Sequence, residues 1–172
     1  CSKIDFAVES SGGSVANTLA GLSQLGSQAG FIGRVRNDKL GASFTNEIKA
    51  SGTFFNIPPT KQGPPTARCL IFVTSDAQRT MCTYLGASIN LDPTDLDISL
   101  VQKGKFLYLE GYLWDNQSAK AAFLKAAEIA KSVNSKVALS LSDSFCVERH
   151  RNSFIDLVEN NVDILFANED EI

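Results

Sequence analysis

A pair of glycines stands directly before a predicted helix and is the first feature of the sequence that could bind a ligand. Gly12 and Gly13 precede the helix predicted over 14–25, and Asn17 lies on its early turns. Without Cβ atoms, the glycines can adopt positive φ and let a ligand approach the backbone, while free N–H groups at the helix start can donate to its oxygens. Asn17 adds a donor and an acceptor. These groups together suit a polyhydroxylated ligand, although such a pair also occurs in simple turns.

Polar side chains also lie at the ends of three predicted strands. Glu110 lies inside the apolar run KFLYLEGYL, Asp143 follows KVALSLS, and Asn168 and Glu171 follow VDILFA. Ligands of open α/β sheets bind beyond the carboxyl ends of the strands, so these side chains are expected at one edge. A buried, unpaired carboxylate is costly, which favours a bound hydroxyl or cation as the partner of Glu110. Alternatively, Asp143 caps the next helix, and Asn168 forms a capping box with Glu171.

The elements that must position these residues alternate along the chain. The pattern predicts helices over 14–25, 39–51, 117–133 and 147–159 and strands at 29–35, 53–57, 105–113, 136–142 and 162–167. Between them, the exposed linker PPTKQGPPT leads into a hairpin of ARCLIFVT and RTMCTYLG around SDAQ. Strand and helix alternation in the second half predicts an α/β fold with a parallel sheet and right-handed crossovers.

Composition bounds the class of protein. The 172 residues are 44% hydrophobic and 20% charged with a net charge of −3, which is typical of one soluble globular domain. No basic run with interleaved aromatics points to nucleic acid as the principal partner. No apolar run is long enough to span a membrane, and the first residues lack the pattern of a signal peptide, so the expected location is cytoplasmic.

Several other chemistries find no support in the sequence. Cys1, Cys69, Cys82 and Cys146 are widely spaced without a C-x-x-C pair, and they are expected to be reduced. The single histidine, His150, lies among charges on a predicted surface helix, which excludes a histidine-cluster metal site and argues against a Ser-His-Asp triad. Neither a Walker-type phosphate loop nor a G-x-G-x-x-G motif occurs.

The sequence is expected to be truncated at both ends. It begins with Cys1 and reaches its glycine pair too soon for a complete strand and turn, and it ends at Asn168 to Glu171, which would cap a helix that does not follow. A fragment of a longer protein is therefore expected.

One long segment resembles a known family. GGSVANTLAGLSQLGSQAGFIGRVRNDKLGASF is similar to the first signature of the PfkB-type carbohydrate kinases, the ribokinase-like family that also contains adenosine kinase. It combines the glycine pair, the asparagine four residues on, the strand GFIG and the spacing of Asp38 and Gly41. YLEG around Glu110 and ANEDE at 167–171 resemble the family's sugar-contacting strand and its N-x-x-E motif. The resemblance implies a single partial domain over 1–172, with a ribokinase-like parallel sheet, flanking helices and a small β lid at 66–87.

The resemblance also implies a reaction, the transfer of the γ-phosphoryl group of ATP, with Mg²⁺, to a hydroxymethyl group of a sugar or nucleoside. Gly12, Gly13, Asn17 and Glu110 would bind the substrate hydroxyls. The stretch DAQRTMCTYLGAS favours the adenosine kinase-like branch, while ribose, fructose and other keto-sugars remain open as substrates.

The remaining implied residues concern ATP. Asn168 would lie near the phosphates and Glu171 would organise magnesium and its waters, since oxygen ligands suit a hard cation that keeps several waters. Arg79, expected at the base of the hairpin, resembles an arginine that adenosine kinase-type members place near the transferred phosphate. A solvated surface charge is the alternative for Arg79.

Departures from the family pattern limit what this segment can do. Arg36 stands where the family usually has glycine. The family's catalytic aspartate, in a Gly-Ala-Gly-Asp motif, and its amino-terminal substrate-gripping aspartate are both absent, so the segment alone cannot be an active kinase. A non-catalytic sugar- or nucleoside-binding module is the alternative. A Gly-Ala-Gly-Asp motif further along the parent reading frame would support the enzyme, and an early stop codon would support the binder.

The predicted hairpin carries apolar residues on both faces, which are Leu70 and Phe72 on one and Cys69, Ile71 and Val73 on the other. Such a strand favours coverage by a second copy of the chain or by a further part of the lid. A homodimer through the hairpin is one expectation.

Overall fold

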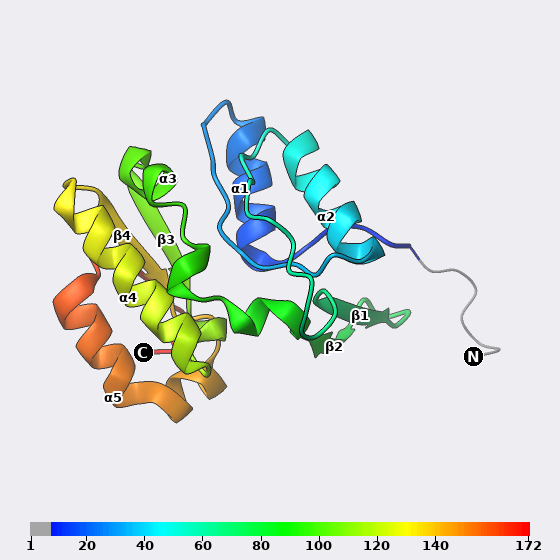
Figure 1. Ribbon diagram of the computed structural model, residues 1–172. Helices are drawn as coiled ribbons and strands as arrows, with labels where there is room; N and C mark the ends of the chain where they lie inside the picture. Colours follow the sequence, from blue (N-terminus) through cyan, green and yellow to red (C-terminus); the bar gives the residue numbers. More distant parts are fainter. Residues whose placement is uncertain (1–7) are drawn as a thin grey trace.

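The computed structural model describes residues 8–172, which form two packed regions joined by a coil and an exposed hairpin (Figure 1). The helices are α1 (Ser14–Gln24), α2 (Lys39–Ala50), α3 (Ile98–Lys103), α4 (Gln117–Ser132) and α5 (Ser144–Asn161). The strands are β1 (Arg68–Val73), β2 (Arg79–Tyr84), β3 (Phe106–Glu110), β4 (Lys136–Ser140) and β5 (Ile164–Phe166). Short 3₁₀ helices cover Gly86–Asn90, Pro93–Asp95 and Gly111–Leu113. None of the helices in this part of the chain is long and apolar enough to cross a membrane.

The larger region contains the parallel sheet β3-β4-β5, as the alternation of elements predicts. Helix α4 packs against β3, β4 and α5 (Figure 1). Its contact face is built from small residues, each at most 3% exposed: Ala119, Ala122, Ala126, Ala127 and Ala130. Small side chains let the helix approach the sheet closely, and Val137 and Leu139 of β4 are fully buried beneath it.

The smaller region surrounds α1 and α2. Its core is an aromatic cluster of Phe31, Phe44 and Phe55, with ring centroids 5.4 to 5.9 Å apart. The strands predicted at 29–35 and 53–57 are not formed. Within these segments only Gly30 and Phe54 form an isolated parallel bridge, and a second bridge, between Arg36 and Thr60, lies just beyond both. Pro58 and Pro59 lie between the paired positions and have no N–H to donate, which interrupts the ladder.

The two largest differences from the predicted element boundaries concern β3 and α5. The strand predicted over 105–113 ends at Glu110, and the chain then turns through Gly111–Leu113. Helix α5 begins three residues before the predicted start because Asp143 caps it by accepting the Cys146 N–H at 2.7 Å. The capping alternative for Asp143 is therefore confirmed, and α3 was not predicted.

The turn at Gly111 leads to a testable result. A Cβ on Gly111 would lie 2.5 Å from the Leu141 carbonyl oxygen, which is backbone and cannot move aside easily. In the full-length protein, Gly111→Ala should lower stability by about 1 to 3 kcal/mol through overpacking. Gly21→Ala is the matched control, since a Cβ there meets no atom within 4 Å and alanine favours a helix. Denaturant unfolding measures both, and equal stability of the two variants would contradict the tight packing.

The hairpin β1-β2 has the two predicted strands, and its register runs from Arg68 opposite Tyr84 to Val73 opposite Arg79. Its apolar side chains are largely exposed on both faces within the described residues, including Leu70 at 60% and Val73 at 65%. The homodimer that would cover them stays a prediction. Among the described cysteines, Cys69, Cys82 and Cys146 are free thiols, as expected, and Cys1 lies outside the described residues.

His150 lies in a charged cluster on helix α5, where charged neighbours were expected. His150 and Arg149 both bind the carboxylate of Asp115, and α5 is kinked at His150, which departs from helical φ and ψ. The histidine therefore ties α5 to the loop that follows Leu113. It has a local structural partner, and no nucleophilic serine takes part in the contact.

Candidate functional site

The carboxyl ends of the three parallel strands meet at one edge, as the sequence predicts. Glu110 pairs with Ser140, and Ser140 pairs with Phe166, so the last residues of β3, β4 and β5 lie side by side. Asp143 and Asn168 follow within three residues of these ends. The topology alone therefore gathers the polar residues that come after each strand.

Glu110 is the link between this edge and α1. The Ser14 hydroxyl donates to Glu110 Oε2, joining residues that are 96 positions apart in the sequence. Burial raises the pKa of Glu110 above its usual value, and the Ser14 hydrogen bond offsets part of that rise. Among the described hydrogen bonds none involves Glu110 Oε1, and this oxygen is not among the fully buried polar atoms without a partner.

The glycine pair lies next to this carboxylate through Ser14. Gly13 begins α1 with φ at 111°, a conformation that favours glycine, and a Cβ on Gly12 or Gly13 would meet no atom within 4 Å. Asn17 lies one turn into the helix and its side chain is exposed. Because Ser14 and Asn17 are three residues apart on a helix, their side chains share a face. The structure thus brings Gly13, Asn17 and Glu110 into one neighbourhood.

Sequence reasoning missed two residues here. Ser14 was not identified as the partner of Glu110, since nothing in the sequence relates two positions so far apart. Tyr112 was also missed, and its hydroxyl donates to the Ser142 carbonyl at 3.0 Å. Burial raises the pKa of Tyr112, and the charges of Asp143, Glu110 and Glu171 raise it further. The position of Tyr112 two residues after Glu110 was the only available signal.

Asn168 and Glu171 show the contacts of the capping alternative. Asn168 Oδ1 accepts the Glu171 N–H at 3.1 Å, and Glu171 Oε2 accepts the Asn168 N–H at 3.4 Å. The Glu171 residue is only 8% exposed. Residues 8–172 contain no group of three His, Cys, Asp or Glu side chains that could hold a metal ion. The observed contacts are therefore those of a capping box, and a role of the pair in holding magnesium stays a prediction.

Arg79 is not at the base of the hairpin, and that expectation is wrong. It pairs with Val73 beside the turn, at the opposite end from Arg68 and Tyr84. The turn needs the five residues 74–78, with Ala77 at positive φ, so β2 starts at its far end. The hairpin lies apart from the strands β3 and β4 in Figure 1.

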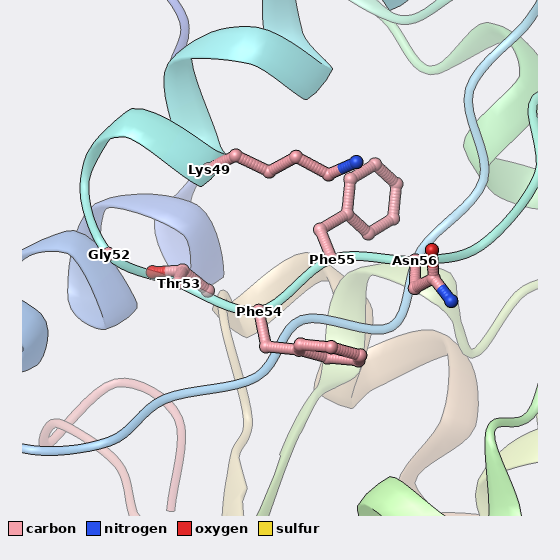
Figure 2. A pocket seen from close by; sticks show the side chains of 6 residues that line it. All are labelled: Lys49, Gly52, Thr53, Phe54, Phe55 and Asn56. Atoms are coloured by element: carbon pink, nitrogen blue, oxygen red, sulfur yellow. The ribbon is translucent and has the colours of Figure 1, made fainter.

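A separate hollow of about 340 Å³ lies at the end of α2 (Figure 2). It is lined by Lys49, Gly52, Thr53, Phe54, Phe55 and Asn56. Figure 2 shows the rings of Phe54 and Phe55 on opposite sides of the extended segment. None of the predicted site residues lines this hollow.

The pattern that describes pfkB family carbohydrate kinases matches residues 5–172. The chain belongs to the pfkB family of carbohydrate kinases. The family resemblance expected from the glycine-pair signature and from YLEG is thereby confirmed.

Two solved structures are similar to this pfkB chain. The adenosine kinase from Sinorhizobium meliloti is 48% identical with a TM-score of 0.92, and the match covers 99% of this chain and 52% of that one. The probable sugar kinase from Rhizobium etli CFN 42 is 47% identical with a TM-score of 0.93 and the same coverage. The curated 5-dehydro-2-deoxygluconokinase of Halalkalibacterium halodurans is 26% identical over 166 residues, which are 93% of this chain and 50% of that protein. The chain spans about half the length of these relatives.

Arg36, where pfkB proteins usually have glycine, has a local role. Its guanidinium donates to the Gly63 carbonyl at 3.2 Å, and its backbone N–H donates to Thr66 Oγ1 at 3.0 Å. Its charge is among the causes that hold the pKa of Asp38 low. Arg36 therefore fastens the proline-rich linker beside the hairpin.

Proposed function

We propose that the full-length protein is an ATP-dependent kinase that phosphorylates a hydroxyl group of a sugar or nucleoside, and that this chain supplies the acceptor-binding side. The observation that supports it is the hydrogen bond between Ser14 and Glu110, which joins the residue after the glycine pair to the carboxylate at the end of β3. Membership of the pfkB family supports the reaction class.

In this proposal the residues of the chain bind and orient the acceptor. Backbone N–H groups after Gly12 and Gly13 donate hydrogen bonds to oxygens of the acceptor substrate. The Asn17 amide donates and accepts hydrogen bonds, and the Glu110 carboxylate accepts a hydrogen bond from a substrate hydroxyl group. The general base expected in a Gly-Ala-Gly-Asp motif is not in this sequence. The complete reaction is therefore assigned to the full-length protein, because phosphoryl transfer needs positioning and charge stabilisation by all parts together.

Asn168 and Glu171 are proposed to act on the side of ATP. Bound magnesium would neutralise charge on the transferring phosphates. Asn168 and Glu171 would orient its waters from the sheet edge, in keeping with their oxygen donors. Arg79 is proposed as a phosphate contact, which would require the hairpin turn to approach that edge.

The acceptor is proposed to be a nucleoside or a sugar. The two similar structures carry the names adenosine kinase and probable sugar kinase at nearly equal identity. The test is to offer the full-length protein adenosine, ribose or fructose with ATP and magnesium. The compound that is phosphorylated identifies the class of acceptor. Binding of an acceptor without any phosphorylation, with ATP present, would favour the non-catalytic binding module.

Asn17→Ala in the full-length protein should raise the Michaelis constant for the acceptor at least several-fold. The amide loses its hydrogen bonds to a substrate hydroxyl, which typically costs about 1 to 3 kcal/mol. Asn46→Ala is the matched control, since Asn46 is also an exposed helical asparagine, on α2. Steady-state kinetics at saturating ATP compares the two, and an unchanged constant for Asn17→Ala would remove it from the acceptor site.

A further inference from the structure

The two ends of the hairpin are fixed at its base, although the strands themselves are exposed. Thr66 is 4% exposed just before β1, and Ala87 is 1% exposed just after β2. The Ala87 N–H donates to the Pro65 carbonyl at 2.8 Å. Gly86 has φ at 52°, and a Cβ there would lie 2.2 Å from the Pro65 oxygen. The base is therefore a close backbone crossing, and the rest of the hairpin extends from it.

One carboxylate connects this base to α2. Asp38 Oδ1 accepts the Gly41 N–H at 2.8 Å and the Thr66 hydroxyl at 2.7 Å, while Oδ2 accepts the Thr66 N–H at 2.9 Å. Burial raises the pKa of Asp38, but the bonds from Thr66 and Gly41 outweigh it and the net pKa lies below its usual value. The ionised group accepts from both elements at once.

A second carboxylate connects α2 to the glycine pair. Glu47, two turns further along α2, accepts the Ser11 N–H through Oε2 at 2.9 Å and the Ser43 hydroxyl through Oε1 at 3.0 Å. Ser11 directly precedes Gly12. A helix is a stiff element, so α2 has a fixed contact to the hairpin near its start and a fixed contact to the glycine segment near its end.

We propose that α2 couples the hairpin to the glycine pair, with Asp38 and Glu47 as the positioning residues at its two connections. Neither carboxylate touches the acceptor in this scheme. A displacement of the hairpin base moves Thr66, then Asp38 and α2, and so the backbone at Ser11 to Gly13. The kinetic part of the test rests on the proposed function, and the hydrogen-exchange part does not.

Asp38→Asn is the sharpest variant, because asparagine caps a helix as well as aspartate does. The Gly41 bond to the remaining oxygen is kept, while the amide NH₂ faces the Thr66 N–H and breaks that bond. Asp97→Asn is the matched control. Asp97 caps α3 through the Leu100 N–H at 3.0 Å and has no contact with the hairpin among the described hydrogen bonds.

In the full-length protein, the rate of amide hydrogen exchange should be about fivefold or more higher in Asp38→Asn than in the wild type. This increase should appear both in residues 67–85 and in residues 8–13. Asp97→Asn should change neither segment. Glu47→Ala should speed exchange in 8–13 and leave 67–85 unchanged. If Asp38→Asn speeds exchange in the hairpin alone, the proposed coupling is wrong. If it changes exchange in neither segment, the proposed role of the Asp38–Thr66 contact in holding the hairpin base is wrong as well.

Thr66 provides a second route if Asp38→Asn fails to fold. Thr66→Val removes the hydroxyl with little change in volume and should reproduce the two-segment effect, while Thr66→Ser keeps the hydroxyl and should match the wild type. In kinetics, Asp38→Asn and Glu47→Ala should each raise the acceptor Michaelis constant about fivefold, and the double variant should raise it less than the product of the two. If the Michaelis constant of the double variant rises by the product of the two single increases, the two carboxylates do not act through the same helix. Should no acceptor be phosphorylated at all, the proposed function fails and the exchange result still decides the coupling.

Discussion

Replacing Glu171 by glutamine in the full-length protein should lower turnover at least tenfold, equivalent to about 1.4 kcal/mol in the barrier. The proposed reason is loss of the charge that organises magnesium and its waters beside the phosphates, where the cation neutralises developing charge. High magnesium should recover part of the loss, because a weakened site fills at higher concentration.

The design of this test follows from the contacts of Glu171. Its Oε2 accepts the Asn168 N–H, and glutamine keeps an oxygen for that bond, so the cap survives the substitution. A magnesium titration of wild type and variant at saturating acceptor and ATP separates the two roles. Glu159→Gln, an exposed position on α5, controls for general loss of negative charge. Superimposable titration curves for Glu171→Gln would leave only the capping role.

Glu110→Gln should weaken function and strengthen the fold at the same time. Glutamine keeps an oxygen for the Ser14 hydroxyl but removes the partly buried charge. The acceptor kcat/KM should fall by about tenfold or more, since a hydroxyl donates more strongly to a carboxylate than to an amide. Thermal stability at pH 7 should rise, because burial disfavours the ionised form of Glu110 in the folded state.

The pH dependence of that stability has a definite sign. The folded-state pKa of Glu110 is raised, so the folded protein binds its proton more tightly and wild-type stability declines as pH rises through that pKa. The advantage of Glu110→Gln should therefore be full near neutral pH and shrink toward pH 4.5. Melting curves from pH 4 to 8 measure it, with the exposed Glu128→Gln as control. An advantage independent of pH would refute the effect of burial, and unchanged kinetics would refute the acceptor contact.

Local pattern was enough to predict most of the fold. The helices α1, α2 and α4 lie within one residue of the predicted limits, and the two β-rich runs form the hairpin. Glu110 and Asn168 were predicted to share an edge of the sheet because parallel topology requires it. The segments 29–35 and 53–57 were predicted as strands from composition, but regular pairing also needs N–H donors that Pro58 and Pro59 lack.

Contacts between distant positions could not be predicted in the same way. The bond from Ser14 to Glu110 and the approach of Tyr112 to Asp143 depend on how α1 and the sheet dock. The position of Arg79 depended on the length of the turn, which five residues fill. Residue type and spacing therefore indicated which side chains could bind a ligand, and tertiary packing decided which neighbours they have.

The separation of the core into two clusters has a consequence for how a ligand would act on the protein. One cluster lies under the sheet, and the other holds Phe31, Phe44 and Phe55 beside α1 and α2. Each can open as its own cooperative unit, and the smaller one buries less apolar surface to resist opening. Glu110 belongs to the first unit and Asn17 to the second, so an acceptor that binds to both residues would stabilise both units. Its binding energy would oppose the opening of either unit, and the apparent melting temperature would rise with acceptor concentration.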